Sequence, residues 1–405
     1  MPFEIPENWE WTTIEDIAES NIGLTYKPTD ICGNGVPVYR SNNIQNRRIC
    51  LKELVRVNTN ILEKQYLQEG DLLICARNGS RNLVGKCAII DNLNEPTSFG
   101  AFMAVCRSAL NPWIFQILNS EYFNTYLDDS NSTAINQVTQ KMLLAFQLPI
   151  PPAAEQERII SKLKQWYEYI DEIEDRKIEL ESYIKQTKSK ILDLAISGKL
   201  VSQDPNDEPA IELLKRINPG FKPCDNSHYE NLPFEIPSNW VWASHNDILE
   251  ISGGAQPPKS EFSEVMKPGY IRLYQIRDYG EKPIPIYIPL STASKTTVKG
   301  DILLARYGGS LGKVFIAEDG AYNVAMAKVI FCYPEILNRK FVYYYYLSSI
   351  YQNKLRSISR TAQAGFNSGD FEDMYFPLPP LNEQERIVDA ISSIWEMIDM
   401  ITAEL

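Results

Sequence analysis

The sequence PPAAEQERI at residues 151–159 returns as PPLNEQERI at residues 379–387, and each copy opens a long periodic stretch. After the first copy, apolar side chains recur at alternating spacings of four and three residues, with breaks at Lys177 and Thr187: Ile159, Leu163, Trp166, Ile170, Ile173, Leu180, Ile184, Ile191 and Leu194. After the second copy the series is Ile387, Ile391, Ile394, Ile398, Ile401 and Leu405. A period of 3.5 residues is typical of a coiled-coil seam. The sequence therefore predicts two long helices that pack through these series.

The ends of both helices carry capping signals. Gly198 lies where a C-terminal cap would stop the first helix, after about 44 residues or roughly 66 Å. Asn382, with Glu385 three residues later, has the pattern of an N-cap and capping box at the start of the second helix. Because this second helix has only about 24 residues up to Leu405, the two helices are predicted to be unequal. A longer natural chain or another subunit would then complete the shorter one.

The duplication extends to the segments that precede the helices. PFEIPxNWxW occurs at residues 2–11 and again at 233–242, and its tryptophans are interpreted as packing anchors. GDLL at residues 70–73 returns as GDIL at 300–303, and an Ala-Arg pair follows each. A repeat this long indicates a duplicated domain with its own helix, and not a solenoid of short units.

Short apolar runs and longer helical segments predict an α+β fold in which two similar mixed α/β domains alternate with the long helices. Strands are expected at Asp71–Cys75, Lys86–Ile90, Asp301–Leu304 and Lys313–Ile316, and helices at Pro112–Asp128 and Arg339–Arg356. The predicted boundaries are 1–152 for the first mixed domain, 153–200 for the central helix, 201–231 for a linker, 232–381 for the second mixed domain and 382–405 for the distal helix.

The charge of the chain is unevenly distributed. Its 40 basic and 52 acidic residues give a net charge of −12, which taken alone disfavours nucleic acid as a partner. Residues 36–86 nevertheless carry about five excess positive charges, and so do residues 266–313, at the matching place in the repeat. Lys and Arg neutralise phosphates, while Arg, Asn and Gln can read base edges. The repeated basic stretch is consistent with DNA binding, and a solvated loop surface is the alternative.

Several other functional classes are disfavoured. The chain has no membrane-length apolar run and no signal segment, so we expect a cytoplasmic protein without a membrane partner. Seven cysteines without C-x-x-C spacing and only two histidines predict no disulfide framework and no metal site. The Gly-rich run 308–313 lacks the first Gly and the final Ser or Thr of a phosphate loop, so we interpret it as a strand turn or a phosphate contact by Lys313. We expect no cofactor.

Taken together, these motifs resemble the specificity subunit of type I restriction-modification systems. The resemblance is carried by PFEIPxNWxW, by the repeated G-D-[LI]-L, and above all by P-P-x-x-E-Q-E-R-I leading into a long helix that ends A-I-S-G-K-L. It implies two target recognition domains, each reading one half of a bipartite site in double-stranded DNA. It also implies antiparallel helices around a pseudo-two-fold axis that set the spacing and dock methyltransferase and restriction subunits. The subunit itself would be non-catalytic, and the coiled coil would permit self-association.

By this resemblance the DNA-binding residues lie in polar loops of the two recognition domains. In the first domain the candidates are Arg40, Asn42, Asn43, Arg77, Asn78, Ser80, Arg81 and Lys86. In the second domain they are Arg272, Gln275, Arg277, Arg306, Tyr307, Ser310 and Lys313. Arg77 and Arg306 form the best-matched pair in the aligned repeats. Weaker candidates precede the long helices: Asn136, Gln137, Gln363 and Asn367.

Two other interpretations remain open from the sequence. The first is a coiled-coil adaptor that binds protein and not DNA, which the net charge of −12 favours. The second is an enzyme in its own right. The chain contains no N-P-P-[FYW] loop for adenine methylation and no Gly-rich motif for S-adenosylmethionine, which argues against a methyltransferase.

Overall fold

The computed structural model describes residues 3–130, 136–222, 232–358 and 365–403, and its contacts divide the chain into two compact units at Ile173/Glu174. Two residues named from the sequence lie outside the described residues, namely the weaker candidate Gln363 and the last apolar position Leu405, and so does His228, one of the two histidines.

The first unit is built on a four-stranded antiparallel sheet in the order β2-β10-β7-β8. Its strands are β2 (Glu19–Ile22), β10 (Met103–Arg107), β7 (Leu72–Cys75) and β8 (Cys87–Ile89). In β7, Leu72 and Ile74 face one hydrophobic core, while Leu73 and Cys75 face another. Successive side chains of a strand point to opposite faces of the sheet. A strand buried on both faces therefore reads as a continuous apolar run, as this one does.

Helices cover one face of this sheet, and a smaller sheet covers the other. The helices are α1 (Ile14–Ile17), α2 (Asn111–Leu118), α3 (Glu121–Ser130) and α4 (Gln140–Ala145). The smaller sheet has the order β6-β3-β9, with β6 (Val55–Val57), β3 (Ile31–Tyr39) and β9 (Ser98–Phe99). β3 runs antiparallel to β6 and parallel to β9. A hairpin of β4 (Ile44–Gln45) and β5 (Arg48–Ile49) projects beside it.

The second unit repeats this arrangement, with the main sheet in the order β13-β20-β17-β18. Its strands are β13 (Leu249–Gly253), β20 (Met326–Phe331), β17 (Ile302–Ala305) and β18 (Val314–Ile316). The smaller sheet follows the order β15-β14-β19-β16, with β15 (Tyr287–Pro289), β14 (Tyr270–Tyr274), β19 (Gly320–Tyr322) and β16 (Thr296–Thr297). The helices are α7 (His245–Ile248), α8 (Arg339–Leu347) and α9 (Ser349–Ile358). The predicted duplication of a mixed α/β domain is confirmed.

Each mixed domain is closed by pairing its first strand with its last. β1 (Glu10–Thr13) lies antiparallel to β11 (Gln147–Ile150), and β12 (Val241–Ser244) lies antiparallel to β21 (Tyr375–Leu378). The repeated tryptophans pack beside these pairs: the ring of Trp9 lies 5.8 Å from that of Trp113, and Trp240 lies 6.4 Å from Phe341. They are packing anchors, as predicted. The long helix that follows each domain thus starts from a fixed strand.

The central helix α5 spans Ala153–Ile196 and ends as predicted at Gly198. Gly198 has φ of +71°, and its N–H donates to the Ala195 carbonyl at 3.2 Å, while the Lys199 N–H donates to the Leu194 carbonyl at 2.8 Å. These two bonds form a Schellman motif, which satisfies carbonyls that the helix end would leave unpaired.

The distal helix α10 spans Leu381–Ala403, so the predicted N-cap at Asn382 is wrong. The Gln384 N–H already donates to the Pro380 carbonyl at 3.0 Å, which places Asn382 inside the first turn. Its side chain donates instead to Asp207 at 3.3 Å, and Arg386 pairs with the same carboxylate at 2.6 Å. Asp207 belongs to the expected linker stretch, which also contains helix α6 (Ala210–Ile217), packed into the core of the second unit.

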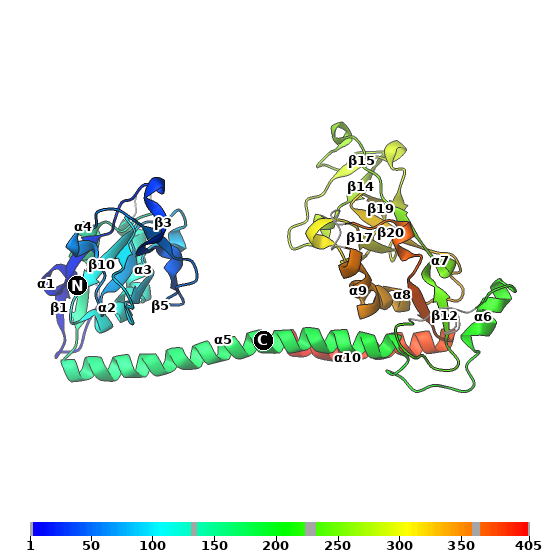
Figure 1. Ribbon diagram of the computed structural model, residues 1–405, viewed down its shortest axis with the longest axis horizontal. Coiled ribbons are helices and arrows are strands. Elements are labelled where there is room, and N and C mark those ends of the chain that lie inside the picture. The colour runs from blue at the N-terminus through cyan, green and yellow to red at the C-terminus, as the bar shows by residue number, and fades with distance from the viewer. Residues whose placement is uncertain (1–2, 131–135, 223–231, 359–364, 404–405) are drawn as a thin grey trace. The chain divides into compact units, whose positions relative to one another are not determined.

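The helices α5 and α10 lie side by side and run antiparallel over the C-terminal part of α5 (Figure 1). Lys188 of α5 contacts both Asp399, at 2.5 Å, and the ring of Trp395. The α10 series is buried at Ile387 and Ile391, but Ile401 is 55% exposed. On α5 the predicted seam is also exposed over much of its length, for example at Ile173, which is 67% exposed. The predicted seam is therefore only partly formed, because α10 as described pairs only with the end of α5.

Candidate nucleic-acid interface

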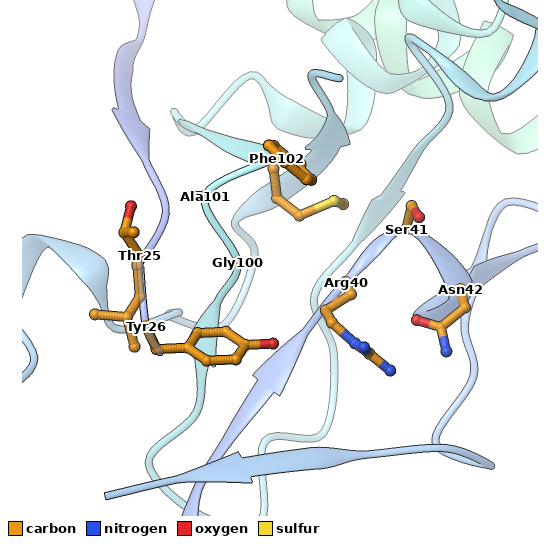
Figure 2. Close-up of a pocket in the computed structure, with 10 residues that line it drawn as sticks. Thr25, Tyr26, Arg40, Ser41, Asn42, Gly100, Ala101 and Phe102 are labelled. Carbon is orange, nitrogen blue, oxygen red and sulfur yellow. The ribbon is translucent and has the colours of Figure 1, made fainter. Parts of the chain in front are cut away.

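Three segments of the first unit converge on a hollow of about 650 Å³. They are the chain after β2 (Leu24–Tyr26), the turn after β3 (Arg40–Asn42) and the turn that joins β9 to β10 (Gly100–Met103). Figure 2 shows Tyr26, Arg40 and Phe102 coming from these three segments, with the Tyr26 ring extending toward Arg40. The hollow therefore combines cationic, amide and aromatic side chains, which are the groups that contact phosphates and bases.

The turn after β3 is held by Asn43, which is buried. Its Oδ1 accepts the Arg40 N–H at 2.9 Å, and its Nδ2 donates to the Cys50 carbonyl at 2.9 Å. Asn43 is thus used within the protein, which does not support the prediction that it contacts DNA. Arg40 and Asn42 remain at the hollow. Among the described residues, the buried Arg40 Nε has no hydrogen-bond partner.

The loop after β7 brings two further predicted residues to the same region. The Arg77 guanidinium lies 5.5 Å from the centre of the Phe102 ring, and Asn78 Nδ2 donates to Ser41 Oγ at 3.1 Å. These contacts join the β7 loop to both turns that line the hollow. Arg40, Asn42, Arg77 and Asn78 therefore form one cluster, although they come from two separate stretches of the chain.

Other predicted basic residues of the first unit make contacts inside the protein. Arg81 pairs with Asp128 of α3, and Lys86 donates to the Ile44 carbonyl at 2.7 Å. Burial of Lys86 also lowers the pKa of its ammonium group. Ser80 is exposed and donates to Asn82, outside the hollow's lining residues. The positive excess counted along the sequence therefore overstates the charge available at the surface.

Two more basic side chains, both in the β4–β5 hairpin, contact the central helix. Asn46 and Arg47 both have positive φ, 48° and 62°, as a tight two-residue hairpin turn requires. At this tip the Arg47 guanidinium lies 3.8 Å from the centre of the Tyr167 ring, and Arg48 pairs with Asp171 at 2.7 Å. The hairpin thus fastens the first domain to α5.

The second unit carries an equivalent turn after β14. The Gln275 N–H donates to the Asp278 carboxylate at 2.8 Å, as the Arg40 N–H does to Asn43. Gln275 Nε2 is buried without a partner among the described residues, and Arg277 is exposed. Arg272 instead lies within β14 and pairs with Asp278 at 3.1 Å. Gln275 and Arg277 therefore lie in the turn itself, and Arg272 supports the turn.

The strand register around the loop after β17 shows that the predicted match between Arg77 and Arg306 is wrong. Met103 pairs with Cys75, and Met326 pairs with Ala305, so Arg77 corresponds to Tyr307 and not to Arg306. A shift of one residue reverses the face on which a side chain lies. The Arg306 guanidinium accordingly donates to the Phe366 carbonyl, with Nη2 at 3.2 Å, while Tyr307 is 43% exposed.

The remaining predicted residues lie in the Gly-rich turn between β17 and β18. This run forms a short 3₁₀ turn over Gly308–Ser310, which confirms the strand-turn interpretation. Ser310 is half-buried, and its carbonyl accepts the Lys313 N–H at 3.0 Å. The Lys313 side chain is exposed. The weaker candidates Asn136 and Gln137 pair with the Arg77 loop, and Asn367 caps a 3₁₀ turn.

Tyr26 and Phe102 line the hollow but were missed by sequence reasoning. Phe102 is 61% exposed, so its ring can be reached from solvent at the wall of the hollow. The available signal was an aromatic residue in the turn S-F-G-A-F-M, between two strands and close to the polar loops. Its position beside Arg77 required the tertiary structure.

The described residues contain no group of three His, Cys, Asp or Glu side chains placed to hold a metal ion. No helix in this part of the chain combines the length and apolar character needed to cross a membrane. His245 is fully buried, and its Nε2 lies 2.7 Å from the Tyr346 hydroxyl, so it is a core histidine with a hydrogen-bond partner.

Comparison with known proteins identifies the family. The model of the type I restriction modification DNA specificity domain matches residues 6–182 and 237–405. The chain belongs to the family of type I restriction-modification specificity subunits. It is the DNA specificity subunit, and the non-catalytic one, of a type I restriction-modification complex. This membership favours DNA recognition over the adaptor and enzyme interpretations.

Relatives resemble this specificity subunit in sequence, and solved structures resemble it in fold. It is 25% identical to the EcoKI specificity subunit of Escherichia coli K12, over 99% of this chain and 85% of the relative. It is 26% identical to the MjaVIII specificity subunit of Methanocaldococcus jannaschii, over 49% of this chain and 47% of the relative. In fold it resembles a chain from a study of complex assembly in the type I restriction-modification system, with TM-score 0.68 and 18% identity, covering 100% and 94% of the two chains. The HsdS subunit of Thermoanaerobacter tengcongensis has TM-score 0.54 and 18% identity, covering 100% and 93%.

Proposed function

We propose that each mixed domain of this specificity subunit reads one half of a bipartite site in double-stranded DNA, and that α5 and α10 set the distance between the halves. The proposal is supported chiefly by the same polar turn recurring at the same place in both domains: Arg40–Asn42 after β3 and Gln275–Arg277 after β14. Duplicated readers joined by helices suit a site with two separated half-sites.

The residues proposed to contact DNA line the hollow or lie in the equivalent turns and loops. In the first domain they are Arg40, Asn42, Arg77 and Asn78, with Tyr26 and Phe102 added. In the second domain they are Gln275, Arg277, Tyr307 and Lys313. Ser80, Arg81, Lys86, Arg272, Arg306 and Ser310 are retained as weaker candidates.

Within the complex, we propose that methyltransferase subunits dock on the paired helices and that restriction subunits join them. The subunit would work in the cytoplasm, where the DNA that it selects is found. Self-association through the coiled coil is the less favoured use of these helices.

The direct test is to mix the subunit, assembled with its methyltransferase partner, with a pool of random duplexes at moderate salt and to sequence the bound fraction. We expect enrichment of two short motifs at a fixed spacing. Enrichment of a single motif would contradict the bipartite proposal, and no enrichment would contradict sequence-specific DNA reading by this chain.

A second test uses the salt dependence of binding. Arg77→Gln is expected to weaken DNA binding and to reduce the slope of log affinity against log salt by about one, because one phosphate-neutralising cation is lost. Arg56→Gln is the matched control, since the Arg56 guanidinium is engaged by both oxygens of Glu95, at 2.8 and 2.5 Å. An equal change of slope in both variants would contradict a direct role for Arg77.

A further inference from the structure

Hydrogen bonds align the DNA-facing turns of the two domains residue by residue, although their sequences differ. The Gly100 N–H donates to the Tyr39 carbonyl at 2.9 Å, and the Asn323 N–H donates to the Tyr274 carbonyl at 3.1 Å. Tyr39 and Tyr274 end the strands that pair in parallel with β9 and β19. Arg40 therefore occupies the place of Gln275, and Asn42 occupies the place of Arg277.

The scaffold of this turn is the same in both domains. Asn43 in one and Asp278 in the other accept the backbone N–H of the first turn residue, at 2.9 and 2.8 Å. A side-chain acceptor three residues along the chain closes the turn locally, whatever residues stand between. The backbone of the turn is therefore held in the same way in both domains. The residues at its first and third positions, 40 and 42 or 275 and 277, differ.

The side chains at the first position of the turn, Arg40 and Gln275, share a further property. Arg40 Nε and Gln275 Nε2 are both buried nitrogen donors without a hydrogen-bond partner among the described residues. Leaving a buried donor unpaired is costly, so such donors usually have a ligand or water partner. Buried donors without a partner among the described residues thus lie at equivalent places in the two turns.

We propose that positions 40 and 42 in the first domain, and 275 and 277 in the second, select the bases of the two half-sites. The proposal deepens the proposed function and rests on it. Arg, Asn and Gln are the side chains that make paired hydrogen bonds to guanine and adenine edges. The first position holds Arg40 in one domain and Gln275 in the other, and the third holds Asn42 and Arg277. Each domain therefore presents a different pair of base-contacting side chains on the same turn.

The test exchanges these residues between the turns. The double variant Arg40→Gln/Asn42→Arg gives the first turn the readers of the second, and Gln275→Arg/Arg277→Asn makes the reverse exchange. Each double variant keeps the net charge of the chain, so its non-specific affinity for phosphates is expected to stay within about twofold of the parent. Each is assembled with the methyltransferase partner and selected from the random duplex pool beside the parent.

We expect the first variant to change the bases enriched in one half-site only, and the second to change only the other, with the spacing unaltered. Half-sites identical to those of the parent would overturn the proposal. Loss of all binding by a variant whose thermal unfolding midpoint matches the parent would also overturn it, because the turns would then hold DNA without selecting bases. If one variant fails to fold, the other decides. A parent that enriches nothing would refute the proposed function itself.

Discussion

His245 shows how burial determines the state of a single side chain. The imidazole lies between the Tyr346 hydroxyl and the Phe371 ring, which stacks on it at 5.0 Å. Burial disfavours the charged form and lowers the pKa of His245 to about 4. The unfolded chain, with an ordinary pKa near 6.5, therefore binds the proton more tightly than the folded protein does.

This difference predicts a loss of stability in weak acid. The contribution is fully present above pH 6.5 and is lost as the pH falls toward about 4. Between pH 6.5 and 5 the free energy of unfolding is expected to fall by about 2 kcal/mol more in the parent than in His245→Gln, which cannot take up this proton. Denaturant unfolding across this pH range measures the difference. Equal losses in the two proteins would refute this account of His245.

At the scale of the element, α10 is anchored at its start and progressively exposed toward its end. Ile387 and Ile391 are fully buried, while Met400 and Ile401 are 63% and 55% exposed. The regular apolar spacing predicted a uniform seam, yet a position on a helix face is buried only where another element covers it. The cover comes from the end of α5 and from α8, with the Tyr344 ring 5.3 Å from Trp395.

This gradient makes a prediction with an internal control. Ile391→Ala is expected to lower the free energy of unfolding of the second unit by about 2–4 kcal/mol, through lost burial and a cavity. Ile401→Ala removes the same atoms from an exposed site and is expected to cost no more than about 0.5 kcal/mol. Thermal or denaturant unfolding distinguishes the two. Similar costs at both sites would show that the packing gradient along α10 is wrong.

At the scale of the whole molecule, α5 is the continuous element that joins the two units. It runs unbroken from Ala153 to Ile196, and its middle exposes Ile178 and Tyr183, which are 66% and 58% exposed. If this helix sets the spacing between half-sites, its length and its helical phase both matter. A change of seven residues shifts the length by roughly 10.5 Å and the phase by only about 20°.

Deleting residues 177–183 shortens α5 by roughly 10.5 Å with little change of phase, and is therefore expected to shorten the selected spacing while both half-sites stay the same. Deleting five residues, 178–182, turns the two ends by roughly 140° relative to each other and is expected to abolish two-motif enrichment. Pool selection reads out both results. An unchanged spacing after the seven-residue deletion would mean that α5 does not act as the ruler.

The sequence alone was sufficient for the duplication, the mixed α/β class, the long helices and the family. These follow from periodicity, repeated motifs and caps such as Gly198, which act over a few residues and can be read along the chain. It also predicted a DNA-binding region in the polar loops near Arg40, Arg77 and Gln275, because polar residues cluster in the loops between buried strands.

Only the tertiary structure decided which of these polar residues are available. Arg81 and Lys86 are used by partners far along the chain, Asp128 and the Ile44 carbonyl, and a contact between distant residues leaves no periodic trace in the sequence. Asn43 is used by backbone groups of its own turn. The match of Arg77 with Tyr307 depends on strand register, and a shift of one residue reverses the face of the sheet. The equivalence of Arg40 with Gln275 likewise became visible only when backbone hydrogen bonds aligned two turns whose side chains differ.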